Sequence, residues 1–314
     1  MSRDKKQNFK FKHSLGQNFI TDEFLLEDIA DESGITKDDL VLEIGPGNGA
    51  LTRCLCDRAK YVIIVEIDKS LIPLLKSNLK EYNNVSIINA DFLKFDFQNI
   101  INKFLSISDF RPIKVVANLP YYITSPIIQN LLQNPYISEM TLMVQKEVAE
   151  RIVATPGNKD FGVLTLACNY FADTEMIMIV SKDCFYPKPK VDSAVVHFVK
   201  HKEFIDPNVN HIVRDDNNIT HIVRGDDTAE VSASSTSVLN DDYLNLFKLI
   251  KASFAQRRKK LLNSLTNAGY DKESLTDAFK KLNFDENVRA ENLSLGDYKK
   301  LLNLLIKHQS KNNL

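Results

Sequence analysis

Short apolar runs alternate with amphipathic stretches between residues 22 and 200 of this chain. This alternation is typical of β-α units wound into a mostly parallel sheet. The apolar runs predict strands at 40–45, 61–67, 85–90, 113–118, 140–145, 175–180 and 193–199. The stretches between them predict helices at 22–33, 49–59, 69–80, 125–133, 146–154 and 162–171. We therefore predict an α/β fold for this part of the chain.

The pattern changes twice after residue 200. Residues 201–240 form a polar stretch in which HIVRDDNNIT is followed by a near copy, HIVRGDD, and two copies are too few for a solenoid. We interpret this stretch as a hairpin or a disordered insertion and assign it no activity. Further on, apolar residues recur at helical spacing: Leu244, Phe247, Ile250, Phe254, Leu261, Leu262 and Leu265. The predicted organisation is an α/β domain at 1–200 with a basic arm at 1–20, an acidic insertion at 201–240 and a helical domain at 241–314.

The net charge of −1 conceals a strong asymmetry along the chain. Residues 1–12 carry a net charge of +4 and residues 241–314 one of +5, whereas residues 201–240 carry −4 and residues 13–200 carry −6. Basic ends on an acidic middle would suit a polyanion gripped from two sides. Solvated charge runs without a partner explain the counts equally well.

Composition narrows the class of protein. With 44% hydrophobic and 26% charged residues, the chain has the make-up of an ordinary globular protein. It has no run of about 18 apolar residues to span a bilayer, and its N-terminus lacks the apolar stretch of a secretory signal, so we predict a cytoplasmic protein. The four cysteines form no CxxC knuckle, which favours reduced thiols over a zinc site, and we expect no metal.

A glycine-rich loop follows the first predicted strand, where an open α/β sheet holds its ligand. Gly45 and Gly47 let the backbone approach a ligand and turn without a Cβ clash. Glu66 lies 21 residues beyond Gly45, where its carboxylate would accept hydrogen bonds from both ribose hydroxyls, and Asp91 would meet an adenine amino group. The spacing also satisfies the relaxed dinucleotide fingerprint, so an NAD-dependent dehydrogenase is the alternative. Glu43 before the loop and a third glycine within it favour S-adenosylmethionine without deciding the matter.

The sequence Asn118-Leu119-Pro120-Tyr121 follows the fourth predicted strand, on the same rim as the glycine loop. An exocyclic adenine nitrogen is a poor nucleophile because its lone pair is delocalised into the ring. The Asn118 side-chain oxygen and the Leu119 carbonyl would accept its hydrogens, draw the nitrogen toward tetrahedral geometry and free the lone pair. Pro120 would hold the turn rigid, and Tyr121 would offer a face on which a flipped base stacks. The stretch predicts methylation of an adenine N6 amino group, with an ordinary strand end and a core tyrosine as the alternative.

Seven stretches, taken in order, resemble the KsgA family of ribosomal RNA adenine dimethyltransferases. They are 15–19, 43–52, 66–68, 90–91, 118–122, 185–194 and 254–259, which together span nearly the whole chain. The resemblance implies a Rossmann-like S-adenosylmethionine-dependent methyltransferase sheet with a small C-terminal helical domain. It also implies dimethylation of two adjacent adenosines in the 3′-terminal hairpin loop of 16S rRNA in the small ribosomal subunit, and a role in subunit maturation. We separately predict a monomer.

The resemblance also implies roles for individual residues. The cofactor S-adenosyl-L-methionine, which leaves as S-adenosylhomocysteine, would contact Gln17, Asn18, Phe19, Gly45, Gly47, Glu66, Asp91 and Asn118. Asn118 and Leu119 would hold the target amino group. Tyr121 and Phe185 would sandwich the base, and two prolines would stiffen the loop that presents Phe185. Four basic residues would contact RNA phosphates, although an exposed charged helix face is the alternative: Arg257, Arg258, Lys259 and Lys260.

Two related functions remain open at this point. One is the enzyme that methylates an adenine of 23S rRNA and confers macrolide resistance, which has a similar loop and turn; Leu119, Asp192 and the FAQRRKK stretch favour the small-subunit enzyme. The other is a non-catalytic RNA-binding assembly factor, against which the intact loop and turn argue. The insertion at 201–240 is longer than the usual link between the two domains of the family.

Overall fold

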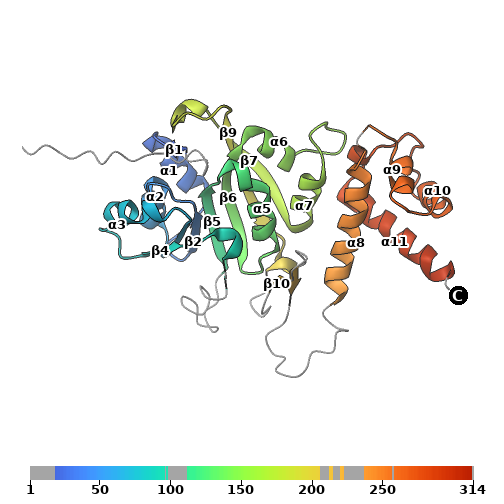
Figure 1. Ribbon diagram of the computed structural model, residues 1–314, viewed down its shortest axis with the longest axis horizontal. Helices are drawn as coiled ribbons and strands as arrows, with labels where there is room; N and C mark the ends of the chain where they lie inside the picture. The colour runs from blue at the N-terminus through green and yellow to red at the C-terminus, as the bar shows by residue number, and fades with distance from the viewer. Residues whose placement is uncertain are drawn as a thin grey trace, which may run out of the picture.

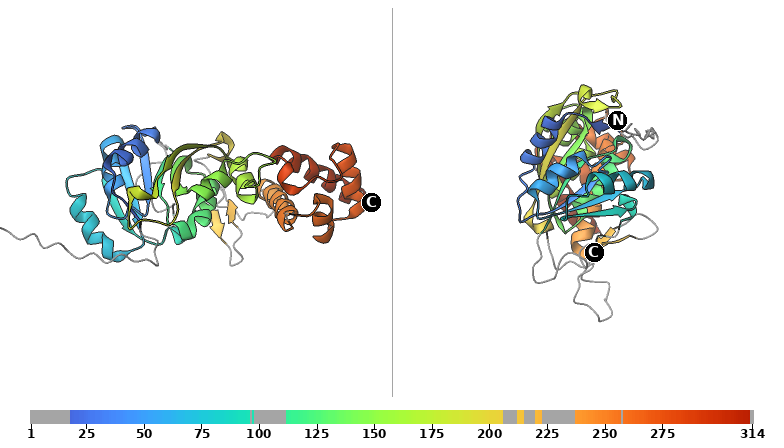
Figure 2. Two further views of the ribbon diagram at one scale, coloured as in Figure 1. Left: turned by 90° about the horizontal axis from the view of Figure 1, so that it is seen from above. Right: turned by 90° about the vertical axis from the view of Figure 1, so that its left-hand side faces the viewer.

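A computed structural model describes residues 18–95, 97, 112–205, 212–214, 220–222, 237–256 and 258–312 of the protein. An α/β part built on one large sheet and a helical part lie end to end (Figure 1). Figure 2 shows the helical part extending away from the sheet. None of the helices in these ranges combines the length and the apolar character that crossing a bilayer requires.

Seven strands form the large sheet in the described part of the chain, in the order β4-β3-β2-β5-β6-β9-β7. They are β2 (Leu40–Ile44), β3 (Tyr61–Glu66), β4 (Val85–Asn89), β5 (Ile113–Asn118), β6 (Ile137–Gln145), β7 (Ala172–Val180) and β9 (Ser193–Lys200). Neighbours are parallel except for β9, which runs antiparallel to both β6 and β7. The seven predicted strands and the mostly parallel sheet are confirmed.

Alternate residues of the central strands pack into two separate cores. Leu42 and Ile63 belong to one core, and Val41 and Ile64 belong to the other. All four side chains are fully buried. Near-continuous runs of Val, Ile and Leu are needed in strands of a parallel sheet because helices cover both of its faces.

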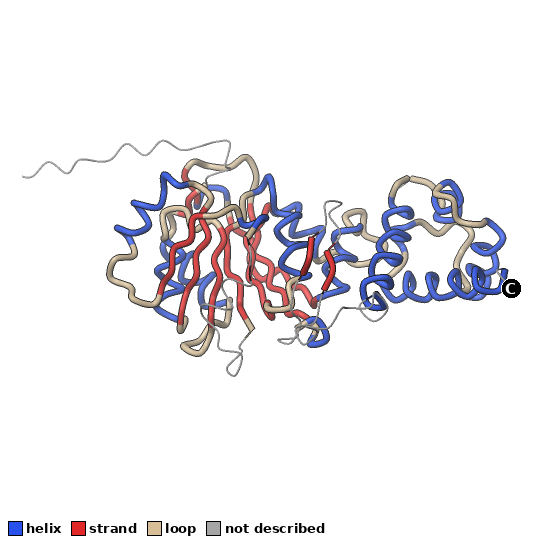
Figure 3. Tube along the Cα trace, turned by 60° about the horizontal axis from the view of Figure 1, so that its bottom comes forward, coloured by secondary structure: helices blue, strands red, loops and turns tan. Residues whose placement is uncertain are grey.

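Helices cover both faces of the sheet (Figure 3). The core on one face contains side chains of α1 (Glu23–Glu32), α2 (Ala50–Arg58) and α3 (Ile72–Asn78). The core on the other contains side chains of α5 (Thr124–Gln133), α6 (Lys146–Ile152) and α7 (Val163–Phe171). These six helices confirm the predicted ones. The predicted helix at 69–80 starts with a separate 3₁₀ turn, Lys69–Leu71, because Pro73 has no N–H to donate to the Lys69 carbonyl.

The helical part has a core of its own. Its helices in the described residues are α8 (Ser237–Phe254), α9 (Leu261–Asn267), α10 (Lys272–Lys281) and α11 (Leu295–Asn312). Leu249, Leu265 and Tyr298 are among its fully buried members, and Leu166 of α7 joins it from the α/β part. The predicted C-terminal helices are confirmed, whereas the domain boundaries at 200 and 240 stay predictions.

Short elements complete the description. Strands β10 (Ile212–Arg214) and β11 (Thr220–Ile222) pair antiparallel. For these six residues of the insertion, the structure agrees with a hairpin. Far from each other in sequence, β1 (Phe19–Ile20) and β8 (Phe185–Tyr186) also pair antiparallel. Single 3₁₀ turns lie at Phe92–Lys94, Tyr121–Ile123, Lys182–Cys184, Lys202–Phe204 and Ala290–Asn292.

Candidate active site

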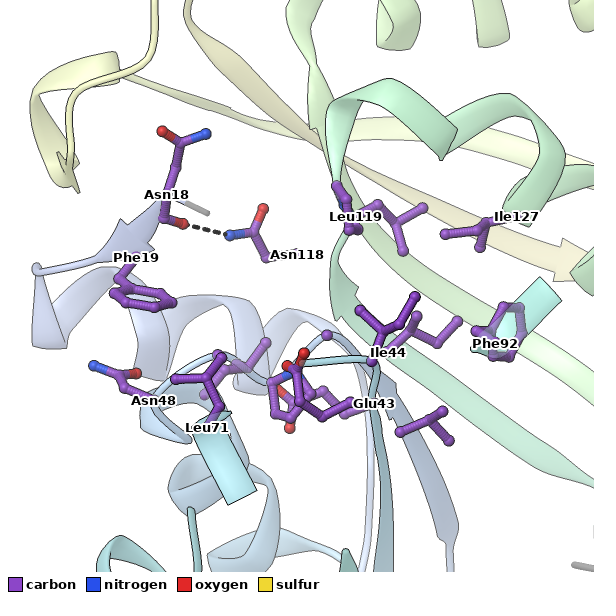
Figure 4. Close-up of a pocket in the computed structure, with 18 of the residues that line it drawn as sticks. Asn18, Phe19, Glu43, Ile44, Asn48, Leu71, Phe92, Asn118, Leu119 and Ile127 are labelled. Carbon is purple, nitrogen blue, oxygen red and sulfur yellow. Dashed lines mark hydrogen bonds between the residues drawn. The ribbon is translucent and has the colours of Figure 1, made fainter. Parts of the chain in front are cut away.

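A cavity opens where the parallel strands β2, β3, β4 and β5 end (Figure 4). Residues from the loops that follow these strands form its wall, because the carboxyl ends of parallel strands meet at one edge of a sheet. The N-terminal strand β1 closes another side. The wall brings together these predicted site residues: Asn18, Phe19, Gly45, Gly47, Glu66, Asp91, Asn118, Leu119, Pro120 and Tyr121.

The glycine loop is held under the ring of Phe19. Gly47 has a φ of +60°, in the left-handed region that favours glycine. A Cβ added there would lie 2.6 Å from Cε1 of Phe19, so an aromatic ring covers the loop directly. Figure 4 shows the Phe19 ring between Asn118 and Asn48 of the loop. The approach of β1 to the loop therefore depends on the missing side chain of Gly47.

Glu43 is a buried acid in the wall of the cavity. Its carboxylate accepts a hydrogen bond of 2.6 Å from the Thr52 hydroxyl of α2. Burial raises the pKa of Glu43 to about 8, and the nearby Glu66 carboxylate adds to the rise, against the opposing hydrogen bond from Thr52. The Glu43 carboxyl therefore holds its proton at neutral pH in the folded chain.

Replacing Glu43 with Gln should make stability less dependent on pH. In the folded chain the pKa of Glu43 lies above the unfolded value of 4.5, so ionisation favours unfolding as pH rises from about 4.5 to about 8. Glu43→Gln cannot ionise and keeps an oxygen for Thr52. We compare the free energy of unfolding of Glu43→Gln with that of the natural chain. The difference in favour of the variant should grow by a few kcal/mol between pH 5 and pH 8.5, on the order given by linkage. Urea unfolding at both pH values measures this; a constant difference would contradict a raised pKa.

Glu66 ends strand β3 with its carboxylate buried. The carboxylate accepts a hydrogen bond of 2.7 Å from the backbone N–H of Asp68. Burial raises the pKa of Glu66, and the backbone N–H groups of Asp68, Gly47 and Ile67 oppose the rise. These bonds fix the carboxylate at the edge of the cavity and tie it to the glycine loop.

Glu66→Ala should weaken the binding of S-adenosylmethionine by roughly tenfold or more, the range for a lost hydrogen bond to a charged group. The reason is the loss of an acceptor that the protein holds in place before the ligand arrives. Calorimetric titration measures the affinity, and Glu32→Ala, at the exposed end of α1, is the control for removal of an acid. Unchanged affinity in Glu66→Ala would contradict the predicted contact of this residue with the ribose.

Asn118 ends strand β5 with its side chain oriented by a backbone group. Its Nδ2 donates a hydrogen bond of 3.2 Å to the carbonyl oxygen of Asn18, drawn as the dashed line in Figure 4. A carbonyl oxygen only accepts, so the amide nitrogen of Asn118 must face Asn18. The amide oxygen of Asn118 is left to accept a hydrogen bond from another donor at the cavity.

The residues after Asn118 form a tight turn at the rim. The Leu119 N–H donates to the Met143 carbonyl across the sheet, at 3.0 Å, and the Leu119 side chain is buried. The Pro120 carbonyl accepts from the Thr124 hydroxyl at 3.1 Å. Burial raises the pKa of Tyr121, against the opposing hydrogen bond of its hydroxyl with Ser193. The Tyr121 hydroxyl is therefore neutral at physiological pH.

Some predicted residues lie elsewhere. Phe185 is 4% exposed, pairs with Ile20 and packs in the core beside β1, so it does not line the cavity. Three of the basic residues, Arg258, Lys259 and Lys260, are exposed in the turn between α8 and α9, with Lys260 at the N-cap of α9. Gln17 and Arg257 lie outside the described residues. Asp91, in contrast, lines the cavity, and its carboxylate accepts a hydrogen bond from the Leu93 N–H at 3.1 Å, at the start of a 3₁₀ turn.

The sequence assigns no role to two other residues at the cavity, although both lie in stretches that resemble the family. Ile67, half-exposed, and Tyr122, 54% exposed, both line the cavity. Ile67 follows a recognisable carboxylate at a strand end, and that position is the signal that points to it. Ser193 touches Tyr121 but lies more than seventy residues away in sequence, so spacing alone does not reveal it.

The cysteines lie apart from any metal-binding group in the described part of the chain. Cys54 and Cys56 lie in α2 and Cys168 in α7; all three are buried, and burial raises the pKa of each thiol to about 12. In the ranges that the structure describes, three or more His, Cys, Asp or Glu side chains nowhere gather in a way that would hold a metal ion.

Known proteins are similar to this chain in sequence and in fold. The family model described as ribosomal RNA adenine dimethylase matches residues 8–215. The chain is 41% identical over 305 residues to the ribosomal RNA small subunit methyltransferase A of Lachnoclostridium phytofermentans, covering 96% of this chain and 93% of that protein. A dimethyladenosine transferase from Plasmodium falciparum superposes with a TM-score of 0.68 at 24% identity, covering 94% of this chain and 98% of the other. The 23S rRNA methyltransferase ErmE superposes with a TM-score of 0.62 at 24% identity, covering 92% and 99%. The two structures confirm the Rossmann-like methyltransferase fold with a helical C-terminal part.

Proposed function

The chain belongs to the ribosomal RNA adenine dimethylase family, and on that premise we propose that it transfers methyl groups from S-adenosylmethionine to N6 of two adjacent adenosines in the 3′-terminal hairpin loop of 16S rRNA. The product would be N6,N6-dimethyladenosine in the small ribosomal subunit, formed in the cytoplasm by a monomer during subunit maturation. The name of the relative at 41% identity supports the small subunit as the source of the RNA.

The orientation of the Asn118 side chain carries the proposal. Asn18 holds the amide nitrogen of Asn118, so the amide oxygen remains for a donor such as the adenine amino group. With the Leu119 carbonyl as a second acceptor, both hydrogens of that amine would be engaged. The nitrogen would then present its lone pair, and its proton would leave after the methyl transfer. No strong general base is required.

The wall of the cavity suits S-adenosylmethionine, whose sulfonium group supplies an electrophilic methyl when it is bound. Glu66 would accept hydrogen bonds from the ribose hydroxyls, since its carboxylate is fixed at the strand end. The Asp91 carboxylate would accept a hydrogen bond from the adenine amino group of the cofactor. The remainder of the cofactor site would be lined by the glycine loop, which lies under the Phe19 ring, and by four further residues. The residues are Gly45 and Gly47 of the loop, and Gln17, Asn18, Phe19 and Asn118.

The target base would stack on Tyr121, which lines the cavity. Phe185 is the proposed partner on the other face of the base. Because Phe185 is buried beside β1, this sandwich requires the β8 loop to change its packing when RNA binds. A crystal structure with a bound adenosine would show whether Phe185 moves.

The basic turn before α9 would contact the RNA backbone. Arg258, Lys259 and Lys260 are exposed there, and Arg257 precedes them in sequence. Contacts of this kind position an RNA without reading its sequence. Recognition of the two adenosines would therefore come from the cavity and from the shape of the ribosomal particle.

The decisive experiment offers the purified protein two substrates. Unmethylated small ribosomal subunits and protein-free 23S rRNA are each incubated with S-adenosylmethionine, digested to nucleosides and analysed by mass spectrometry. We expect N6,N6-dimethyladenosine in the small-subunit RNA alone. Product on 23S rRNA instead would transfer the assignment to the resistance enzyme, and no product on either RNA would contradict methyl transfer altogether.

A further inference from the structure

Ser193 is a fully buried hydroxyl in contact with the proposed base-stacking residue. Its Oγ lies 2.7 Å from the hydroxyl oxygen of Tyr121, and either group is able to donate. Because β9 runs antiparallel to its neighbours, its first residue lies at the edge where the parallel strands end. A buried serine at the start of β9 thus reaches the rim of the cavity.

The backbone around Ser193 is held on both sides. In the sheet, Ser193 stands opposite Gln145 of β6 and Val180 of β7. The preceding residue, Asp192, accepts the Lys182 N–H at 3.0 Å with its carboxylate and the Lys146 N–H at 3.0 Å with its carbonyl. The Ser193 hydroxyl is therefore a fixed reference point for the Tyr121 ring.

Tyr121 needs such a reference because its backbone lies in a short turn. The 3₁₀ turn Tyr121–Ile123 has no side-chain cap, and the next residue, Tyr122, is 54% exposed. A buried tyrosine hydroxyl usually has a hydrogen-bond partner. That bond restricts the tilt of the ring, and the tilt sets the plane on which a base stacks. The Ser193 hydroxyl is that partner.

We propose that Ser193 is a positioning residue for methyl transfer, which acts by fixing the plane of the Tyr121 ring at the wall of the cavity. The inference rests on the proposed function, since it assumes that Tyr121 contacts the target base. Ser193 itself touches neither the cofactor nor the base. Its effect on the reaction passes through the hydrogen bond with Tyr121.

The test is a double-mutant cycle on the full-length protein. Ser193→Ala, Tyr121→Phe and the double variant are compared in single-turnover methyl transfer to unmethylated small ribosomal subunits. We expect each single variant to react about fivefold more slowly, on the scale of one neutral hydrogen bond. The double variant should be no slower than either single variant, because both remove the same bond. Affinity for S-adenosylmethionine, measured by calorimetry, should stay within about twofold.

A second buried serine provides the matched control. Ser253 of α8 is also buried; its hydroxyl donates a hydrogen bond of 2.8 Å to the Leu249 carbonyl, and it lies in the helical part away from the cavity. Ser253→Ala should lower the melting temperature as Ser193→Ala does, and leave the rate of transfer unchanged. If both variants lost transfer rate in proportion to their loss of melting temperature, the positioning role of Ser193 would be overturned.

The remaining outcomes separate the inference from the function on which it rests. Two outcomes would overturn the role of Ser193 and leave the proposed function intact. One is a double variant whose rate loss is the product of the two single losses. The other is a Ser193→Ala variant that reacts as fast as the natural protein while Tyr121→Ala is inactive. A natural rate in Tyr121→Ala would remove the stacking role of Tyr121 itself. If Ser193→Ala fails to fold, a Tyr121→Phe variant that reacts as fast as the natural protein would still overturn the inference.

Discussion

Asn118→Ala should lower turnover by roughly a hundredfold, the scale seen when a positioned hydrogen bond to a transition state is lost. The alanine removes the amide oxygen that would accept from the adenine amine, so the lone pair of the nitrogen stays delocalised. It also removes the 3.2 Å bond to the Asn18 carbonyl, which is a smaller effect because both residues are only partly buried. S-adenosylmethionine should still bind, since Glu66 and the glycine loop are unchanged.

Single-turnover rates on small ribosomal subunits, combined with calorimetry of cofactor binding, measure both parts of this expectation. Asn84→Ala is the matched control, because Asn84 also donates its amide to a backbone carbonyl, that of Cys56 at 2.9 Å, but at the opposite edge of the sheet. It should cost stability without affecting turnover. Near-natural turnover in Asn118→Ala would show that the lone-pair argument is wrong.

The strands and helices of the α/β part follow from local sequence. Runs such as VLEI in β2 and VIIVE in β3 carry the apolar continuity that a doubly covered parallel strand needs. Once the sheet is parallel, its geometry places Gly45, Glu66, Asp91 and Asn118 at one edge without further information. That is why residues from four separate loops could be predicted to share one site.

What the sequence does not reveal depends on contacts between distant segments. Strands β1 and β8 are two residues long and carry no periodicity, so their pairing across more than 160 positions leaves no pattern to read. The same pairing buries Phe185, which the motif alone suggests to be at the site. The Tyr121–Ser193 bond and the protonated state of Glu43 likewise arise from packing that only the folded chain creates.

Gly47→Ala should abolish most cofactor affinity, a loss of roughly tenfold or more, because two penalties act together. A left-handed φ costs an L-residue on the order of 1–2 kcal/mol, and the new Cβ would lie 2.6 Å from the Phe19 ring. The ring, and β1 with it, would have to move away from the glycine loop. Calorimetric titration with S-adenosylmethionine and thermal unfolding measure the two consequences.

Gly34 separates the two penalties, because it has nearly the same φ, +59°, and no atom within 4 Å of an added Cβ. Gly34→Ala should therefore show the backbone cost alone, with cofactor affinity unchanged. If the clash causes the additional loss, Phe19→Ala should cost less stability in the Gly47→Ala background than in the natural chain, since the smaller side chain relieves the overlap. Equal costs in the two backgrounds would mean that Phe19 does not press on the loop, and that β1 closes the cavity for another reason.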